Sequence, residues 1–205
     1  APGGILGLVG ESGSGKSMTA LAIMRLLPRG ATLAGSIRLG EKELTTLSER
    51  RMCTLRGGQV GMIFQEPMTA LNPVQTIGDQ VAETLLVHRA AGRAEAMEIA
   101  KARLTRVGLS PDRFPLSRYP HELSGGQRQR VCIALAVALR PRLLIADEPT
   151  TALDVTTQAQ ILELIGELVA EEGMACLLIT HDLAVVAEMA GRIAVMRAGE
   201  VMEQG

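Results

Sequence analysis

Aromatic side chains are almost absent from this sequence of 205 residues, which has no tryptophan, one tyrosine and two phenylalanines. Proteins that bind single-stranded nucleic acids stack the bases on aromatic rings, so the composition argues against that class. Lysine and arginine number 21 against 22 aspartate and glutamate residues, and the formal net charge is -1. A general nucleic-acid binder carries a basic excess, so we expect no nucleic-acid partner. Arg50, Arg51 and Arg56 form a small basic cluster that is interpreted as a solvated face.

Cysteine and long apolar runs are also scarce. Cys53, Cys132 and Cys176 lie far apart, without the spacing of a zinc site or a disulfide framework. Each lies in or beside an apolar stretch and is interpreted as a small buried side chain. No apolar run approaches the roughly 20 residues of a membrane-spanning helix, and the first residues do not resemble a signal peptide. We therefore expect a soluble, intracellular chain that meets a membrane only through a partner.

Apolar runs and helical patterns alternate along the chain. Hydrophobic residues make up 47% of the sequence, which is enough for one substantial core. The patterns predict strands over 4–10, 36–39, 59–64, 143–146, 175–180, 192–196 and 200–202, and helices over 15–27, 76–88, 94–107, 126–139, 156–170 and 183–189. Apolar strands that alternate with helices are typical of a parallel sheet covered on both faces. The long stretch without strands after Glu66 indicates a helical insertion into an α/β domain.

Residues 10–17, GESGSGKS, fit the phosphate-binding pattern G-x-x-x-x-G-K-[ST] between a predicted strand and a predicted helix. Glycines let successive backbone N–H groups point at phosphate oxygens, and a helix N-terminus adds partial positive charge. Lys16 is expected to reach the β- and γ-phosphates, and the Ser17 hydroxyl to bind Mg²⁺. A glycine-rich turn without a ligand is the weaker alternative. The residues expected to bind the nucleotide here are Gly10, Ser12, Gly13, Ser14, Gly15, Lys16 and Ser17.

A second motif is the apolar strand at 143–146, which ends in Asp147 and Glu148. Asp147 at the tip of the strand can hold Mg²⁺ through water. Glu148 is placed to accept a proton from an attacking water molecule. Polar residues at a strand end are common, but the phosphate-binding loop elsewhere in the chain favours the catalytic interpretation.

A third motif, LSGGQ at 123–127, opens a predicted helix. Ser124, Gly125 and Gly126 can present free N–H groups to an anion. Ser124 can equally be an ordinary helix cap, and the two interpretations are compatible. One chain then has a single phosphate-binding loop and a second phosphate-type site, which suggests that the second site serves a different nucleotide.

With LSGGQ ahead of the Asp-Glu strand, nearly the whole chain resembles the ATP-binding cassette (ABC) ATPases. Gln65 resembles the Q-loop glutamine of that family, Ala152-Leu153-Asp154 its D-loop, and His181 its switch histidine. The strings FQEPMTALNP at 64–73, RYPHEL at 118–123 and PTTALDVT at 149–156 are similar to the ATP-binding subunits of dipeptide, oligopeptide and nickel importers.

The resemblance implies a P-loop NTPase (RecA-like) α/β core over residues 1–66 and 142–205, with a mainly parallel sheet. An ABC-type helical subdomain that carries the signature would be inserted at 67–141. Only nine residues precede Gly10, where the family has two or more strands, so we expect the N-terminal β-strands to be missing.

The resemblance also implies how the site works. Two cassettes would pair head to tail, with ATP between the phosphate-binding loop of one and the signature of the other. Glu148 would polarise water, His181 would contact the γ-phosphate, and Gln65 would sense Mg²⁺ and the attacking water. The implied Mg²⁺ ligands are Ser17, Gln65 and Asp147; the residues implied to face a nucleotide across the dimer are Ser124, Gly125, Gly126, Gln127 and Asp154.

The implied cofactors are ATP and Mg²⁺, and the implied activity is ATP hydrolysis that drives import of peptides or of a related solute such as nickel or glutathione. The implied partners are a second ATPase subunit, permease subunits in the membrane and, indirectly, a solute-binding protein. Such a chain is cytoplasmic and peripheral on the inner face of the cell membrane. A soluble ABC ATPase uncoupled from transport and a non-hydrolysing regulatory module are the alternatives, and the presence of Glu148 and His181 argues against the second.

Overall fold

The computed structural model describes residues 3–205, apart from the side chains of residues 67 and 68. Its main sheet has six strands in the order β4-β5-β6-β1-β7-β8. Their bounds are β1 (Ile5–Gly10), β4 (Val60–Ile63), β5 (Leu143–Asp147), β6 (Ala175–Thr180), β7 (Arg192–Arg197) and β8 (Glu200–Gln204). All are parallel except β8, which returns antiparallel beside β7. The prediction of an α/β fold with a mainly parallel sheet is therefore confirmed.

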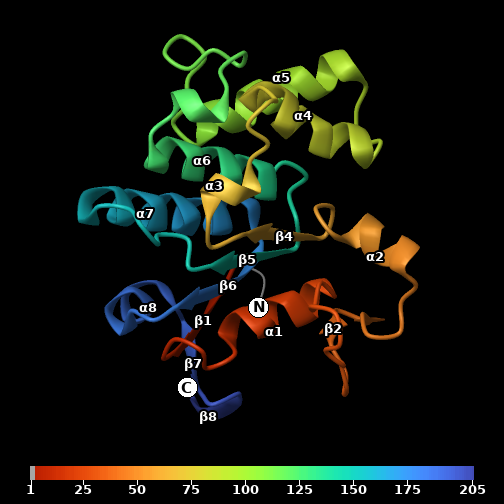
Figure 1. Cartoon of the computed structure of the whole chain (residues 1–205), viewed down its shortest axis with the longest axis vertical. Coiled ribbons are helices and arrows are strands. Elements are labelled where there is room, and N and C mark those ends of the chain that lie inside the picture. Colours follow the sequence, from red (N-terminus) through yellow and green to blue (C-terminus); the bar gives the residue numbers. More distant parts are fainter. Residues whose placement is uncertain (1–2) are drawn as a thin grey trace.

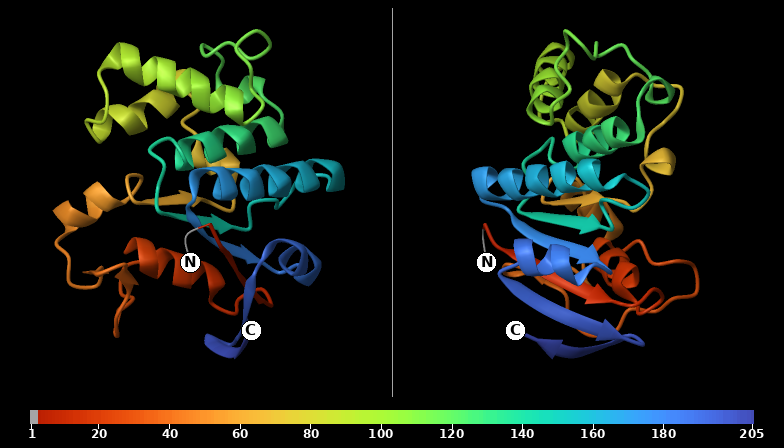
Figure 2. Two further views of the ribbon diagram at one scale, coloured as in Figure 1. Left: turned by 180° about the vertical axis from the view of Figure 1, so that it is seen from behind. Right: turned by 90° about the vertical axis from the view of Figure 1, so that its left-hand side faces the viewer.

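Helices pack on both faces of this sheet (Figures 1 and 2). On one face lies α1 (Lys16–Met24), whose Ala20 and Met24 share a cluster with Leu8 of β1. The opposite face is covered by α6 (Gly125–Ala136), α7 (Val155–Glu172) and α8 (Leu183–Met189). Because side chains alternate along a strand, Leu8 faces α1 whereas Gly7 lies against Val186 of α8. Among the described helices, none combines the length and the apolar character that crossing a membrane would require.

The chain between the neighbouring strands β4 and β5 is helical, and no strand interrupts the described residues from 64 to 142. It contains α3 (Pro67–Ala70), α4 (Ile77–Val87), α5 (Arg93–Arg106), the short 3₁₀ helix η1 (Pro120–Glu122) and α6. The sequence patterns did not predict α3 and η1. Helices α4 and α5 lie at the top of Figure 1, and α6 packs both on them and on β4 and α7. The division of the chain into units at 66/67 and 141/142 stays a prediction.

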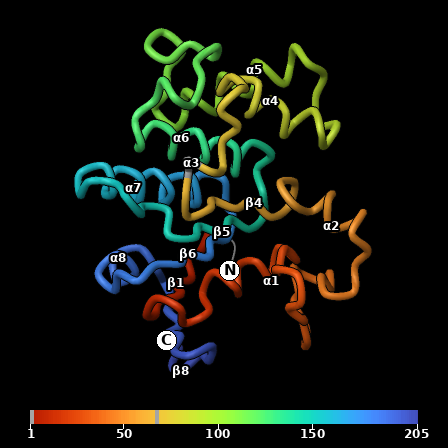
Figure 3. The backbone as a smooth tube through the Cα atoms, in the orientation of Figure 1, coloured from red at the N-terminus to blue at the C-terminus, as the bar shows by residue number. Residues whose placement is uncertain are grey.

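The segment between α1 and β4 forms a small lobe that projects at the right of Figure 3. It contains the antiparallel pair β2 (Arg38–Leu39) and β3 (Lys42–Glu43), and the helix α2 (Glu49–Leu55). Of these strands, the sequence predicted the first and missed the second. Leu44, Met52 and Leu55 form a separate cluster of buried residues here.

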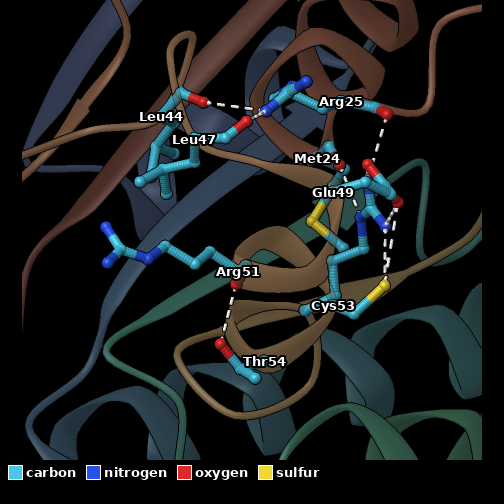
Figure 4. A network of polar contacts seen from close by, with 9 residues as sticks. Met24, Arg25, Leu44, Leu47, Glu49, Arg51, Cys53 and Thr54 are labelled. Carbon is cyan, nitrogen blue, oxygen red and sulfur yellow. Dashed lines mark hydrogen bonds and ion pairs between the residues drawn. The ribbon is translucent and has the colours of Figure 1, made fainter.

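Two arginines, Arg25 and Arg56, join this lobe to the end of α1. Figure 4 labels Arg25 and the pairing partner of Arg56, Glu49. Arg25 follows α1 with a left-handed backbone, φ 52°, and its guanidinium donates to lobe carbonyls. Arg56 donates back to carbonyls at the end of α1, over 2.8 and 3.1 Å, and pairs with Glu49. The prediction of a solvated face was wrong for Arg56, because these bonds leave its side chain only 18% exposed. The accepting carbonyls are those of Met24, Arg25, Leu44 and Leu47.

The three cysteines differ in their surroundings. Cys132 and Cys176 are buried as predicted, and burial raises the pKa of each thiol to about 12. Cys53 is exposed, so the prediction of a buried side chain was wrong there. Helix α2 buries Met52 and Leu55, which are three residues apart on one face, and Cys53 lies off that face.

Gly61 provides a test of how closely α6 approaches β4. A Cβ atom at this position would lie 2.2 Å from the backbone oxygen of Ala136, at the end of α6, and 3.0 Å from Cγ of Pro141. We expect Gly61→Ala to lower the free energy of unfolding by about 1–3 kcal/mol, because the backbone must shift to admit the methyl group. Urea unfolding monitored by circular dichroism measures the change.

Gly191→Ala is the matched control, because a Cβ atom there would have no neighbour within 4 Å in the part of the chain that the structure describes. We expect it to change the free energy of unfolding by less than about 0.5 kcal/mol. Equal stability of the two variants would contradict the close approach of α6 to β4.

Candidate functional site

The carboxyl ends of the parallel strands lie at one edge of the sheet. The register pairs Ile63 of β4 with Ala146 of β5, and Val9 of β1 with Thr180 of β6, so these strands end at the same level. The loops that follow them surround a cleft of about 590 Å³. Its lining residues are Ser12, Gly13, Ser14, Gly15, Lys16, Ser17, Met18, Gln65, Glu148, Thr151 and His181. The structure thus brings together the residues that follow β1, β4, β5 and β6.

The loop between β1 and α1 curls around the amino group of Lys16. Gly13 and Gly15 have left-handed backbones, with φ of 81° and 99°, which glycine adopts without a steric penalty. Lys16 is 6% exposed, and its Nζ donates to the carbonyl oxygens of Gly10 at 2.8 Å and Glu11 at 2.9 Å. Among the described residues no side chain caps the N-terminus of α1, so its first N–H groups can bind an anion together with Lys16.

Ser17 and Asp147 meet at the base of the cleft. The Ser17 hydroxyl donates to Oδ1 of Asp147 over 3.0 Å, and Asp147 is 4% exposed. Burial raises the pKa of Asp147, while the hydrogen bond from Ser17 opposes that rise. Among residues 3–205 no three His, Cys, Asp or Glu side chains are placed to hold a metal by themselves. The oxygens of Ser17, Asp147 and Gln65 fit Mg²⁺, which binds one or two protein carboxylates and takes phosphate and water oxygens as its other ligands.

Glu148 and His181 contact each other within the cleft. Nδ1 of His181 lies 2.9 and 3.1 Å from the two carboxylate oxygens of Glu148. Their side chains are 12% and 70% exposed, so Glu148 lies deep in the cleft and His181 at its mouth. Glu148 has a left-handed backbone with φ 48°, which is rare for a residue with a side chain and concentrates at functional sites. The pair can accept a proton and hydrogen-bond an oxyanion.

The signature residues do not line this cleft. Ser124 caps α6 by accepting from the N–H of Gln127 at 3.3 Å, and Oε1 of Gln127 accepts from the N–H of Ser124 at 2.9 Å. This reciprocal capping box fixes the start of the helix. Ser124 and Gly125 are exposed to solvent and are not among the residues that line the cleft of their own chain.

Asp154 also lies outside the cleft and caps α7. Its carboxylate accepts from the backbone N–H of Thr157 at 3.0 Å and from the Thr157 hydroxyl at 2.6 Å, and these bonds lower the pKa of Asp154. Thr157 in turn packs on the signature, because a Cβ atom on Gly126 would lie 2.6 Å from its Cγ2. The starts of α6 and α7 are therefore held together.

Two residues near Glu148 were not predicted from the sequence. Thr151 lines the cleft, with its hydroxyl 3.5 Å from a carboxylate oxygen of Glu148. Gln129 of α6 donates to the carbonyl of Pro149 over 2.6 Å. The nearness of Thr151 to Glu148 in the sequence was the available cue for the first. No sequence signal set Gln129 apart, because it stands between Arg128 and Arg130 in the polar first half of α6.

Comparison with known proteins agrees with this geometry. Residues 1–151 match the ABC transporter family. A putative peptide import ATP-binding protein of Brucella melitensis biotype 1 is 56% identical over 211 residues, covering 100% of this chain and 62% of its own length. The oligopeptide transport ATP-binding protein AppD of Bacillus subtilis is 53% identical over 203 residues, covering 98% of this chain and 62% of its own length. The chain thus spans less than two thirds of the length of these relatives.

A solved structure has the same fold. The ATP-binding cassette MJ0796, in a dimeric post-hydrolysis state bound to ADP and Pi, superposes with a TM-score of 0.86 at 32% sequence identity. The match covers 100% of this chain and 86% of that one. The chain matches the family over residues 1–151, is more than half identical to relatives along its length, and shares the fold of a solved cassette. This chain therefore belongs to the ABC transporter family.

Proposed function

We propose that this chain is the ATP-binding and ATP-hydrolysing subunit of an ABC importer for peptides or a related solute such as nickel or glutathione. The observation that carries the proposal is the single cleft that gathers the loop around Lys16, Ser17 and the Glu148–His181 pair. The names of the peptide and oligopeptide import relatives support the substrate class. The placement of Glu148 in the cleft argues against a non-hydrolysing regulatory module.

In this proposal the loop at 10–17 binds the phosphates of ATP. Lys16 and the free N–H groups of α1 neutralise the β- and γ-phosphates. Bound Mg²⁺ would supply positive charge that offsets the charge of those phosphates, with Ser17, Asp147 and Gln65 as its protein ligands. The hydrogen bond between Ser17 and Asp147 holds both side chains next to the loop.

Glu148 then acts as the general base. It takes a proton from the attacking water, whose oxygen bonds to the γ-phosphorus while the bond from that phosphorus to the β–γ bridging oxygen breaks. ADP leaves with the electron pair of the broken bond, and inorganic phosphate is released. His181 holds the Glu148 carboxylate through Nδ1, which leaves its other ring nitrogen for the γ-phosphate.

The partners follow from the position of the signature. Ser124, Gly125, Gly126 and Gln127 lie outside this chain's own cleft, so in the proposal they bind the γ-phosphate held by a second cassette. Asp154 would contact that second cassette, and the dimeric state of MJ0796 is consistent with such pairing. The helical insertion would contact permease subunits at the cytoplasmic face of the membrane, with a solute-binding protein delivering the solute to them.

Reconstitution tests the transport part of the proposal. The chain, assembled in vesicles with its two permease subunits, should hydrolyse ATP faster when a peptide-loaded binding protein is added. Hydrolysis that never depends on the permease would favour a soluble ABC ATPase. Nucleotide binding without any hydrolysis would favour a regulatory module.

Glu148→Gln tests the role of the base. The amide keeps the size of the side chain but cannot take a proton, so we expect hydrolysis to fall by about 100-fold or more while ATP affinity is kept. Phosphate release and isothermal titration measure the two quantities. Glu163→Gln, on the exposed face of α7, makes the same change outside the cleft and should retain wild-type hydrolysis. A turnover near that of the wild type in Glu148→Gln would exclude Glu148 as the base.

Ser124→Arg tests the composite site. The bulky side chain would occupy the place of the partner's γ-phosphate, so we expect ATP-driven dimerisation to be lost. The affinity of the single chain for ATP should stay unchanged, because Ser124 is outside its own cleft. Analytical ultracentrifugation with and without ATP gives the oligomeric state.

A mixture makes this test sharper. A Ser124→Arg chain and a Lys16→Ala chain can together form at most one intact composite site. We expect the mixture to dimerise and turn over more than either variant alone, yet less than the wild type. Dimerisation and turnover of the mixture at the full wild-type level would contradict a nucleotide shared between two chains. Dimerisation and turnover no higher than those of the separate variants would contradict it as well.

A further inference from the structure

Gln129 is a buried amide that connects the signature helix to the catalytic edge of the sheet. It lies on α6 just after the signature and is 1% exposed. Its Nε2 donates a 2.6 Å hydrogen bond to the carbonyl of Pro149, the residue that follows Glu148. Among the described residues, its Oε1 has no hydrogen-bond partner. An unpaired buried oxygen is unfavourable, so Gln129 carries a cost that an apolar side chain of similar size would avoid.

The other buried glutamine shows what a purely structural amide looks like here. Gln80 of α4 is 6% exposed, and both ends of its amide are bonded to backbone groups nearby in the sequence. Its Oε1 accepts from the N–H of Asn72, and its Nε2 donates to the carbonyls of Asn72 and Gln75. Gln129 differs because its bond crosses from the helical insertion to the backbone next to Glu148.

The backbone that carries Glu148 needs such support. Its left-handed conformation, φ 48°, persists only where the surroundings fix it. The N–H of Glu148 donates to Ile179 of β6 at 2.9 Å, which holds one side of the residue. The bond from Gln129 holds the next residue along the chain, Pro149. Gln158 of α7 holds the turn that follows, because its Nε2 donates to the carbonyl of Leu153 over 3.0 Å.

We propose that Gln129 is a positioning residue that fixes Glu148 and couples it to the start of α6. This inference rests on the proposed ATPase function. Helix α6 begins at the signature, which in the proposed function would face the nucleotide of the partner cassette, whereas Glu148 lines the cleft of its own chain. A displacement at the start of α6 therefore moves the Pro149 carbonyl, and Glu148 with it. Through Gln129, occupancy of one composite site sets the geometry of the base in the other.

Gln129→Met is the direct test. Methionine has a similar length, removes the donor and also removes the unpaired oxygen, so the fold is kept. We expect kcat for ATP hydrolysis to fall by about 10- to 100-fold, because small displacements of a catalytic group have effects of this size. KM for ATP should not change, since the phosphate-binding loop is untouched. Gln129→Leu, which also lacks the donor and leaves no buried amide unpaired, gives the same test if the methionine variant is unstable.

Arg130→Met is the matched control on the same helix. It removes the 2.7 Å bond from Nη1 of Arg130 to the carbonyl of Val107 at the end of α5, and a 3.3 Å bond from Nη2 to Oε1 of Gln160. Neither Val107 nor Gln160 lines the cleft. We expect its kcat to stay within about twofold of the wild type, as for other changes away from the reacting groups. A similar kcat for the Gln129 and Arg130 variants would overturn the proposal.

A second readout does not depend on hydrolysis. His181 contacts the Glu148 carboxylate, so its ring resonances in an NMR spectrum report the position of that group. In Gln129→Met we expect the His181 resonances to shift and those of His88 to stay, with His181→Ala identifying the signal. Unmoved His181 resonances would overturn the proposal. A shift in a chain whose wild type hydrolyses no ATP would support the link while contradicting the proposed function.

A dimerisation assay distinguishes a role of Gln129 in positioning Glu148 from a role in folding the signature. In a Glu148→Gln background, ATP-driven dimerisation should be the same with and without Gln129→Met, because the signature itself is intact. Loss of dimerisation in the double variant would assign Gln129 to the structure of the signature and would overturn its role toward Glu148.

Discussion

Parallel pairing of β4, β5, β6 and β1 is the constraint on which the candidate site depends. The strands end at the same level, so the loop at 10–17, Gln65, Glu148 and His181 meet although they are far apart in the sequence. The packing of α1 on one face, and of α6, α7 and α8 on the other, holds that edge in place. In the proposed function, the phosphate-binding loop, the oxygen ligands for Mg²⁺ and the general base therefore share one cleft.

In the proposed function, helix α6 would serve two parts of the mechanism. Its first residues form the signature, which Gly126 and Thr157 tie to the cap of α7 at Asp154. One turn later, Gln129 reaches the Pro149 carbonyl beside the base. The helix also packs on α4 and α5 of the insertion. A movement of the insertion relative to the sheet would therefore displace two groups: the signature, which would bind a second cassette, and Glu148, which would activate water.

Local patterns were sufficient to predict the loop around Lys16 and the Asp147–Glu148 strand end, because strand, turn and helix signals fix their positions. Gln65, His181 and Asp154 lack such a signal and were assigned by family resemblance. Arg56 and Gln129 could not be predicted, since each bonds to a backbone carbonyl whose position depends on packing between distant segments. Cys53 was misassigned because the burial of α2 depends on which face meets the lobe. The two-residue strand β3 has too little pattern to recognise.

The central claim is that the cleft and the signature of one chain serve two different nucleotides. A crystal structure of the Glu148→Gln chain with ATP and Mg²⁺ tests it most directly, because slow turnover keeps the nucleotide intact. The account predicts a head-to-tail dimer in which each γ-phosphate lies between Lys16 of one chain and Ser124 of the other. ATP that touches Lys16 and Ser124 of the same chain, or a bound monomer whose signature contacts no nucleotide at saturating ATP, would contradict it.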